Sequence, residues 1–183
     1  MEIGVQHDGD EVALPADWEI KSLGDLASFR TGPFGSALHK SDYVTDGIPL
    51  VNPMHIVDGS IVPTSDMTVS IKTAYRLSEY ALQVGDVIIG RRGEMGRCAV
   101  VGNKEAGWLC GTGSLIIRPN DNAAAGFMQR MLASRQVVAA IENASVGSTM
   151  VNLNQGILEE LEVPTPPLPE QRAIADALSD VDA

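Results

Sequence analysis

The segment LEVPTPPLPEQRAIA (residues 161–175) divides the chain into a long part and a short part. Four prolines fall within the run 164–169, and such a run favours extended polyproline geometry. This run therefore predicts a stiff, proline-rich hinge. The residues after it, 170–183, place apolar side chains at helical spacing and predict a C-terminal helix. We expect a large domain up to residue 163, then the hinge, then this helix.

The C-terminal helix carries a narrow apolar seam. Ile174, Leu178 and Val181 follow one another at i, i+4 and i+7, which is the spacing of a coiled-coil contact. A helix of barely two heptads is marginal alone in water, and the hinge is expected to hold it away from the domain. We therefore expect the seam to pair with another helix, for example with the same seam of a second copy in a two-fold antiparallel arrangement.

The part before the hinge, residues 14–163, predicts many short strands and few helices. Short apolar or alternating runs bounded by Gly, Pro and Asp indicate strands, and longer periodic segments indicate helices. The expected fold class is α+β, a mainly β domain with peripheral helices. The expected strands lie at 67–71, 87–89 and 115–117, and the expected helices at 73–80 and 126–142.

Charge is distributed unevenly along the sequence. Its 183 residues include 13 Lys and Arg and 24 Asp and Glu, for a net charge of −11. Acids dominate both ends, and residues 1–13 are predicted to form a flexible acidic leader, whereas residues 21–105 are balanced at nine against nine. The total argues against nucleic-acid binding, but the balanced centre leaves room for a local basic surface. There is no secretory signal or membrane-spanning run, and two cysteines suit a reducing cytoplasm.

Motifs for catalysis or cofactor binding are mostly absent. The three histidines lack metal-ligand spacing, the two cysteines are interpreted as buried thiols, and no Walker A loop or dinucleotide motif occurs. The nearest match to the Asn-Pro-Pro-Tyr loop of amino-methyltransferases is Asn52-Pro53-Met54. A metal-nuclease pattern is matched formally by Asp10, Glu19 and Lys21, although Asp10 falls in the expected leader. We expect no catalytic residues, metal or cofactor.

Three segments could instead contact a nucleic acid. Arginines lie among glycines directly after the strand at 87–89, and hydroxyl residues follow the helix at 126–142. The third segment is a glycine-containing loop in which Phe34 lies between two basic residues. Each also has a structural interpretation: a solvated hairpin, a helix stop, and a core aromatic. The candidate DNA-binding residues are Arg30, Lys40, Arg91, Arg92, Arg97, Lys104, Ser148 and Thr149.

A series of short motifs runs in order along residues 14–182. They include Leu14-Pro15-x-x-Trp18, Gly32-Pro33-Phe34-Gly35-Ser36, Gly85-Asp86-Val87-Ile88-Ile89, Gly147-Ser148-Thr149-x-x-x-Leu153-Asn154 and Leu161-x-Val163-Pro164-x-Pro166-Pro167-Leu168-x-Glu170-Gln171. Together they resemble a target-recognition domain of the DNA-specificity (S) subunit of type I restriction–modification enzymes.

The resemblance implies a non-catalytic protein that recognises one half of a split double-stranded DNA target. Such subunits usually carry two recognition domains, each followed by a long helix, and the two helices pair. They bind methyltransferase (M) subunits, and motor-nuclease (R) subunits join that assembly. This sequence has one such domain, and its helix stops at Ala183, so we expect a half-length subunit, a truncated product or a fragment. A protein-interaction module without DNA contact is the rival suggested by the acidity.

Overall fold

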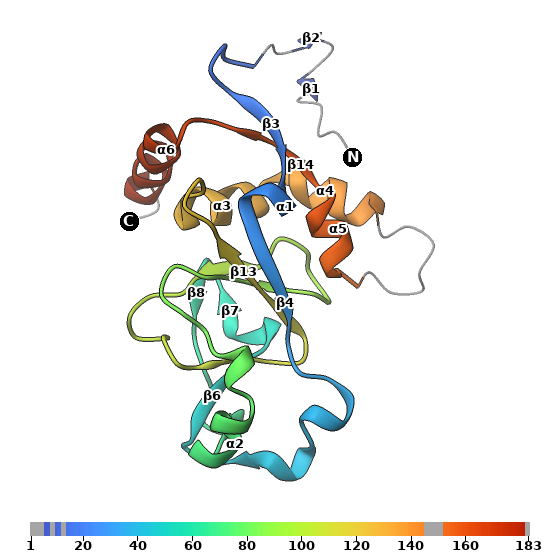
Figure 1. Cartoon of the computed structure of the whole chain (residues 1–183), viewed down its shortest axis with the longest axis vertical. Coiled ribbons are helices and arrows are strands. Elements are labelled where there is room, and N and C mark those ends of the chain that lie inside the picture. The colour runs from blue at the N-terminus through green and yellow to red at the C-terminus, as the bar shows by residue number, and fades with distance from the viewer. Residues whose placement is uncertain (1–5, 8–9, 12–13, 145–151, 182–183) are drawn as a thin grey trace.

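A computed structural model describes residues 6–7, 10–11, 14–144 and 152–181 (Figure 1). It mixes short strands with short helices, as the expected α+β class requires. The strands are β1 Gln6–His7, β2 Asp10–Glu11, β3 Glu19–Ser22, β4 Ala27–Thr31, β5 Tyr43–Val44, β6 Ile48–Val51, β7 Ile56–Val57, β8 Ser60–Ile61, β9 Thr68–Val69, β10 Val87–Gly90, β11 Cys98–Val100, β12 Leu109–Cys110, β13 Ser114–Pro119 and β14 Glu162–Thr165. The helices are α1 Leu23–Leu26, α2 Ile71–Arg76, α3 Ala125–Leu132, α4 Arg135–Ala144, α5 Gln155–Glu159 and α6 Leu168–Val181, with 3-10 turns η1 Gly35–Ala37, η2 Lys40–Asp42, η3 Pro53–His55 and η4 Ser78–Tyr80.

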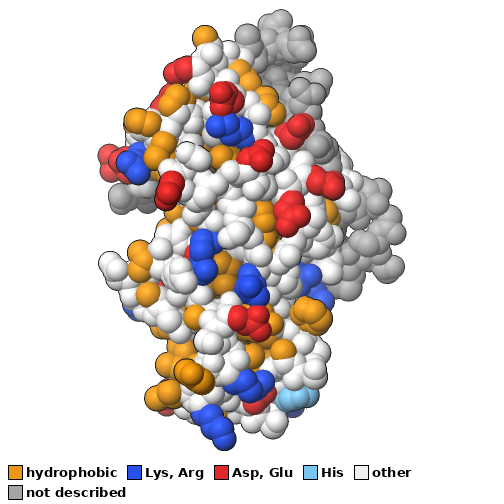
Figure 2. Space-filling view, in the orientation of Figure 1, with side chains coloured by type: hydrophobic (Ala, Val, Ile, Leu, Met, Phe, Trp, Pro, Cys, Tyr) orange, Lys and Arg blue, Asp and Glu red, His pale blue; other side chains and the backbone are white. Residues whose placement is uncertain are grey.

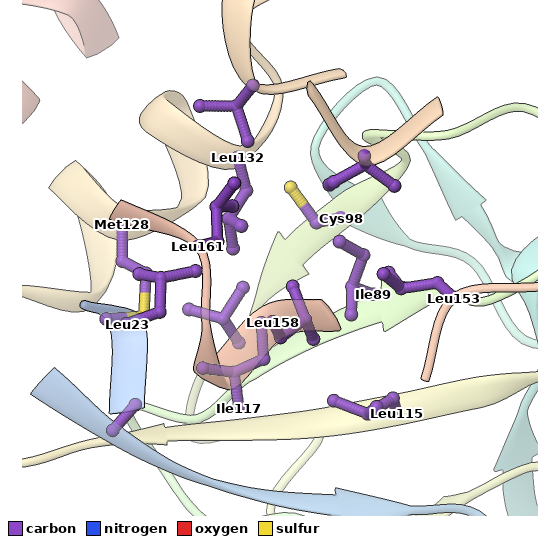
Figure 3. Packing of buried hydrophobic residues seen from close by; sticks show 14 of the residues in the cluster. Leu23, Ile89, Cys98, Leu115, Ile117, Met128, Leu132, Leu153, Leu158 and Leu161 are labelled. Atoms are coloured by element: carbon purple, nitrogen blue, oxygen red, sulfur yellow. The ribbon is translucent and has the colours of Figure 1, made fainter. Parts of the chain in front are cut away.

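The central sheet has the strand order β11-β10-β13-β4, and all its pairs are antiparallel. On one face, Ile89 and Ile117 pack in a cluster with residues of α1, α3, α4 and α5 (Figure 3). On the other face, Ile88 and Ile116 pack with residues of β6, β7, β8 and β12. Because both faces are buried, successive residues of β10 and β13 are apolar, and the expected strands at 87–89 and 115–117 are confirmed.

A second sheet, of order β12-β6-β9-β5, forms a small cluster with α2 and the residues after it. The expected strand at 67–71 is only partly correct, because β9 ends at Val69. Ser70 ends it by capping α2: its hydroxyl accepts a hydrogen bond from the Thr73 amide at 3.2 Å. Ile71 therefore begins a helix, and it is 79% exposed instead of half-buried.

The expected single helix at 126–142 is two helices, α3 and α4. The break lies at Ala133 and Ser134, and the Ser134 hydroxyl accepts a hydrogen bond from the Val137 amide at 3.4 Å. Gly96 packs directly against this break, where a Cβ atom would come 2.4 Å from Val138. The change of direction keeps the buried residues of both helices on the same core, with Leu132 from α3 and Ile141 from α4.

The C-terminal segment is fastened to the domain. β14 pairs antiparallel with β3, so Pro164 and Thr165 of the expected hinge lie in a two-stranded sheet, and α6 begins at Leu168, earlier than expected. Helix α6 packs on α3, where Ala175 lies beside Gly126. The expectation that the prolines hold the helix away from the domain is therefore wrong, because α6 contacts α3.

Gln171 forms the centre of this junction. It is 1% exposed, its Oε1 accepts a hydrogen bond from the Ala124 amide at 2.8 Å, and its Nε2 donates to the carbonyls of Asn122 and Pro166. Next to it, Glu170 accepts a hydrogen bond from the Trp18 indole at 3.2 Å. The motif residue Trp18 thus lies in one junction with Glu170 and Gln171, although 152 positions separate it from Glu170.

Candidate nucleic-acid interface

The basic loop after β10 begins with an arginine that has a structural role. Arg91 is half-buried, and its Nε donates to the Leu153 carbonyl at 2.8 Å, while the Leu153 amide donates to the Arg91 carbonyl at 2.9 Å. Burial, and then the charge of Arg92, lower the pKa of the Arg91 guanidinium. Arg91 therefore ties the loop to the segment before α5.

The other candidate cations of this region differ in their availability. Arg97 donates to Glu94 at 2.6 Å, which offsets its charge locally. Arg92 and Lys104 are exposed, and the structure shows no ion pair for either within the described residues. The loop that is densest in arginines along the sequence thus offers mainly Arg92 on the surface. Whether Arg91, Arg92 and Arg97 contact DNA stays a prediction.

Two further arginines, each paired with a carboxylate, lie where β4, β13 and η4 meet. Arg30 pairs with Glu79 at 2.7 Å, and both side chains are largely exposed. On β13, Arg118 binds the buried Asp86 carboxylate through Nε at 2.7 Å and Nη2 at 2.8 Å, and this hydrogen bonding raises the pKa of Arg118. Arg30, Glu79 and Arg118 line one shallow hollow together with Ser28. Sequence reasoning found Arg30 but missed Arg118.

Helix α2 adds further cations to the same side of the molecule. Arg76 donates from Nη1 to the Ala37 carbonyl at 2.6 Å and pairs through Nη2 with Asp42 at 3.0 Å. A backbone hydrogen bond from His39, with smaller help from Arg76, lowers the pKa of Asp42. These contacts bring α2 beside η2, the turn that carries the predicted cation Lys40.

Sequence reasoning missed Lys72 and Arg76. They lie one helical turn apart on α2, and the only sequence signal was this four-residue spacing, which the helix expected at 73–80 did not include. The nearby loop after β4 presents Phe34, which is 68% exposed, so the alternative that Phe34 is a core aromatic is wrong. An exposed aromatic and several cations therefore share this part of the surface.

Charge is segregated on the face of the molecule that Figure 2 shows. On the face in Figure 2, Lys and Arg lie mainly over the lower half, which contains α2 and β6, and Asp and Glu mainly over the upper half. The counts agree: residues 27–120 hold nine Lys and Arg against eight Asp and Glu, whereas residues 142–183 hold one against eight. The surface best suited to a polyanion is therefore the one formed by residues 27–120, which we call the β-rich half.

Other residues singled out from the sequence have structural partners or fall outside the description. Ser148 and Thr149 lie outside the described residues. His55 is buried; its Nδ1 accepts from the Asn52 amide at 3.1 Å, and burial lowers its pKa. Both thiols are buried, which raises the pKa of Cys98 to about 12 and also raises that of Cys110.

The formal nuclease pattern has no assembled metal site among the residues described. There, no group of three or more His, Cys, Asp or Glu side chains could hold a metal ion. Glu19 instead pairs with Lys21 at 2.8 Å, and the Asp10 side chain lies outside the description. Among the helices described, none has the length and apolar character needed to cross a membrane.

The predicted helix seam is only partly free. Ile174 is half-buried and Leu178 is 42% exposed, while the side chain of Val181 lies outside the description. The Leu178 carbonyl accepts a hydrogen bond from Arg130 of α3 at 3.4 Å. One side of α6 thus contacts its own domain and another side faces solvent.

Comparison with known proteins places this fold among restriction–modification proteins. The chain is 29% identical over 177 residues to a putative type I restriction enzyme MjaX specificity subunit of Methanocaldococcus jannaschii, covering 92% of this chain and 40% of the relative. It is 25% identical over 171 residues to the EcoKI specificity subunit of Escherichia coli, covering 90% and 36%. The chain therefore spans about two fifths of the length of these relatives.

Solved structures show the same fold. The HsdS subunit from Thermoanaerobacter tengcongensis matches with a TM-score of 0.66 at 21% identity, over 97% of this chain and 40% of that one. A chain from a study of complex assembly in a type I restriction–modification system matches with a TM-score of 0.68 at 22% identity, with the same coverage. The family model described as "Type I restriction modification DNA specificity domain" matches residues 15–183. This chain belongs to the family of type I restriction–modification DNA specificity domains.

Proposed function

We propose that this chain recognises one half of a bipartite double-stranded DNA target as the specificity component of a cytoplasmic type I restriction–modification complex. The observation that carries the proposal is the family match over residues 15–183, because the named relatives are specificity subunits. The exposed cations of the β-rich half support DNA contact there. The protein itself supplies no catalytic group, and needs no cofactor for this role.

In the proposed complex, the chain binds methyltransferase subunits, and motor-nuclease subunits join them. An acidic chain with few unpaired cations releases few counterions, so its own affinity for DNA should be low. Contacts from methyltransferase subunits around the DNA would then supply much of the affinity. The proposed DNA contacts are the exposed Arg30, Lys40, Arg92 and Lys104, with Arg91, Arg97, Ser148 and Thr149 as the remaining candidates.

A mobility-shift titration with the cognate methyltransferase subunits tests this function. Addition of the chain should convert sequence-independent binding into binding that prefers one duplex sequence, with no cleavage or methylation by the chain alone. The rival is a protein-interaction module, favoured by the net charge of −11. Binding to methyltransferase subunits with no change in DNA preference would support that rival. Metal-dependent cleavage that Glu19→Ala abolishes would support the nuclease alternative.

We also propose that the exposed side of α6 pairs with a second helix. Its candidate residues are Ile174, Leu178 and Val181, and in this chain the partner would be the same seam of a second copy. Two recognition domains related by two-fold symmetry would then bind a palindromic DNA target whose two half-sites are separated by a gap. Sedimentation of the wild type against Leu178→Asp tests the pairing, and monomers in both samples at high concentration would contradict it.

A further inference from the structure

Helix α2 exposes an apolar strip and a basic strip side by side. Ile71 and Tyr75 are separated by one helical turn and are 79% and 84% exposed. Lys72 and Arg76 have the same separation and are also exposed. Large apolar side chains scattered singly over a surface need no explanation, but an adjacent pair beside two cations is a defined chemical surface.

The helix is held rigidly from behind. Its inner side contributes Ala74 and the following residue Leu77 to the cluster with Leu50 and Val69. Ser70 caps its first turn, and Arg76 joins its last turn to the Ala37 carbonyl and to Asp42. The exposed side chains therefore project from a fixed platform, which precise recognition requires.

The position of α2 suits entry into a groove. It lies at one end of the longest axis of the molecule, and α6 lies in the opposite half (Figure 1). A B-form major groove is about 12 Å wide and admits one helix, provided that the rest of the protein does not collide with the backbones. A short helix at the tip of a domain meets that condition.

We infer that α2 is the element that enters the major groove, with Ile71 and Tyr75 against base edges and Lys72 at a phosphate. Apolar side chains contact the thymine methyl group, a tyrosine hydroxyl hydrogen-bonds to base or phosphate, and lysine neutralises phosphate. Arg76, already bound to Ala37 and Asp42, is a positioning residue. The inference rests on the proposed function, because it names the surface through which the DNA is recognised.

A protein partner fits this surface less well. The core of a specific protein–protein interface is depleted of charge. The exposed strip of α2 spans six residues and has the exposed Lys72 directly beside its apolar pair, while Arg76 is paired with Asp42. Across from it, Lys40 on η2 adds another exposed cation. This charge complements a polyanion, so the occupant to which we assign the surface is duplex DNA.

Selection from randomised duplexes tests the inference with the full chain at low salt. The pool contains duplexes about three helical turns long, and the retained DNA is sequenced for wild type, Ile71→Ala and Tyr75→Ala. Both variants should change or lose the enriched motif and bind it about 5- to 100-fold more weakly. Lys72→Ala should weaken all sequences alike and lower the salt dependence by about one phosphate contact. Val62→Ala and Val84→Ala, each more than half exposed, are matched controls and should leave the motif unchanged.

Photo-crosslinking keeps the test informative when binding is weak. A benzoylphenylalanine is placed in turn at the positions of Tyr75 and Val84, and only position 75 should crosslink to the duplex. An unchanged motif in Ile71→Ala and Tyr75→Ala, with no crosslink, overturns the inference and leaves the proposed function intact. A crosslink from position 75 to a methyltransferase subunit in place of DNA also overturns it. If the wild type enriches no sequence, alone or with methyltransferase subunits, both proposals fall.

Discussion

The β-rich half around α2 and the half that carries β3, β14 and α6 differ in charge and in their internal contacts. The first is nearly neutral, whereas the second holds eight acidic residues and one basic residue over residues 142–183. In the first, one face of the central sheet packs with β6, β7, β8 and β12, whereas in the second the buried amide of Gln171 fastens the C-terminal helix. The net charge of −11 therefore describes neither half.

The central sheet is shared by both halves, so breaking it should have the largest effect. Ile117 is fully buried, and Ile117→Ala removes its contacts and leaves a cavity that costs about 2–5 kcal/mol in the free energy of unfolding. Chemical denaturation measures the loss. Val62→Ala, at a position 56% exposed, is the control and should change stability by less than about 0.5 kcal/mol. A similarly small loss for Ile117→Ala would show that the sheet is not the common core.

Loss of the buried Gln171 side-chain amide should loosen the half that carries α6 and leave the central sheet unchanged. Gln171→Leu keeps a side chain of similar size but leaves the Ala124 amide and the carbonyls of Asn122 and Pro166 without their partner. We expect a cost of about 2–3 kcal/mol and faster hydrogen exchange in α6, with unchanged exchange in β10 and β13. The exposed neighbour change Arg172→Ala is the control. Equal acceleration in both regions would mean that the two halves are one cooperative unit.

Arg92 tests whether the basic loop after β10 contacts DNA. Because its side chain is exposed, Arg92→Ala should leave the fold intact. In the assembled complex it should weaken binding by roughly 1–3 kcal/mol if the arginine recognises a base, and should weaken all sequences alike if it contacts a phosphate. Arg97, already paired with Glu94, should matter less. Unchanged affinity in Arg91→Ala, Arg92→Ala and Arg97→Ala would contradict the loop assignment.

The smallest effect concerns pH and the β-rich half. Burial lowers the pKa of His55 below its ordinary value of 6.5, and protonation of Nδ1 would remove its bond from the Asn52 amide. The unfolded chain therefore takes up this proton at higher pH than the folded chain, so the contribution of His55 to stability is lost as pH falls below about 6.5. We expect the thermal midpoint to fall slightly more on acidification in wild type than in His55→Gln. The same shift in both proteins would contradict a role for His55.

The central fold was predictable because its signal is local. The runs Val87–Ile89 and Leu115–Ile117 have the continuous apolar character of strands buried on both faces. The errors arose where a single capping residue overrides periodicity. Ser70 caps α2 and so ends the alternating strand pattern at 67–71 after Val69. Ser134 lies at the break that divides the expected helix at 126–142 into α3 and α4. The docking of α6 depends on Gln171 contacts with residues about 50 positions away, which no local pattern contains.

The candidate surface was less predictable than the fold. The density of arginines along the sequence favoured Arg91 and Arg97 as DNA contacts. In the fold, however, Arg91 donates to the Leu153 carbonyl and Arg97 pairs with Glu94. Exposed cations come together only through folding, because Arg30 and Lys72 belong to distant segments on the same half of the molecule. The exposure of Ile71 and Tyr75 depends on which side of α2 packs inward, and a six-residue helix carries too short a period to decide that.

The central claim is that DNA contacts the β-rich half and not the acidic half. Two variants, each assembled with methyltransferase subunits, test it by the salt dependence of duplex binding. The first replaces Arg30, Lys40, Lys72 and Arg92 by Ala, and the second replaces Lys21 and Arg172. We expect the first variant to lose affinity, and its slope of log affinity against log salt to become shallower by about 0.9 per lost phosphate contact, while the second binds as wild type. Equal binding by both variants, or a loss confined to the second, would show that the DNA does not contact the β-rich half.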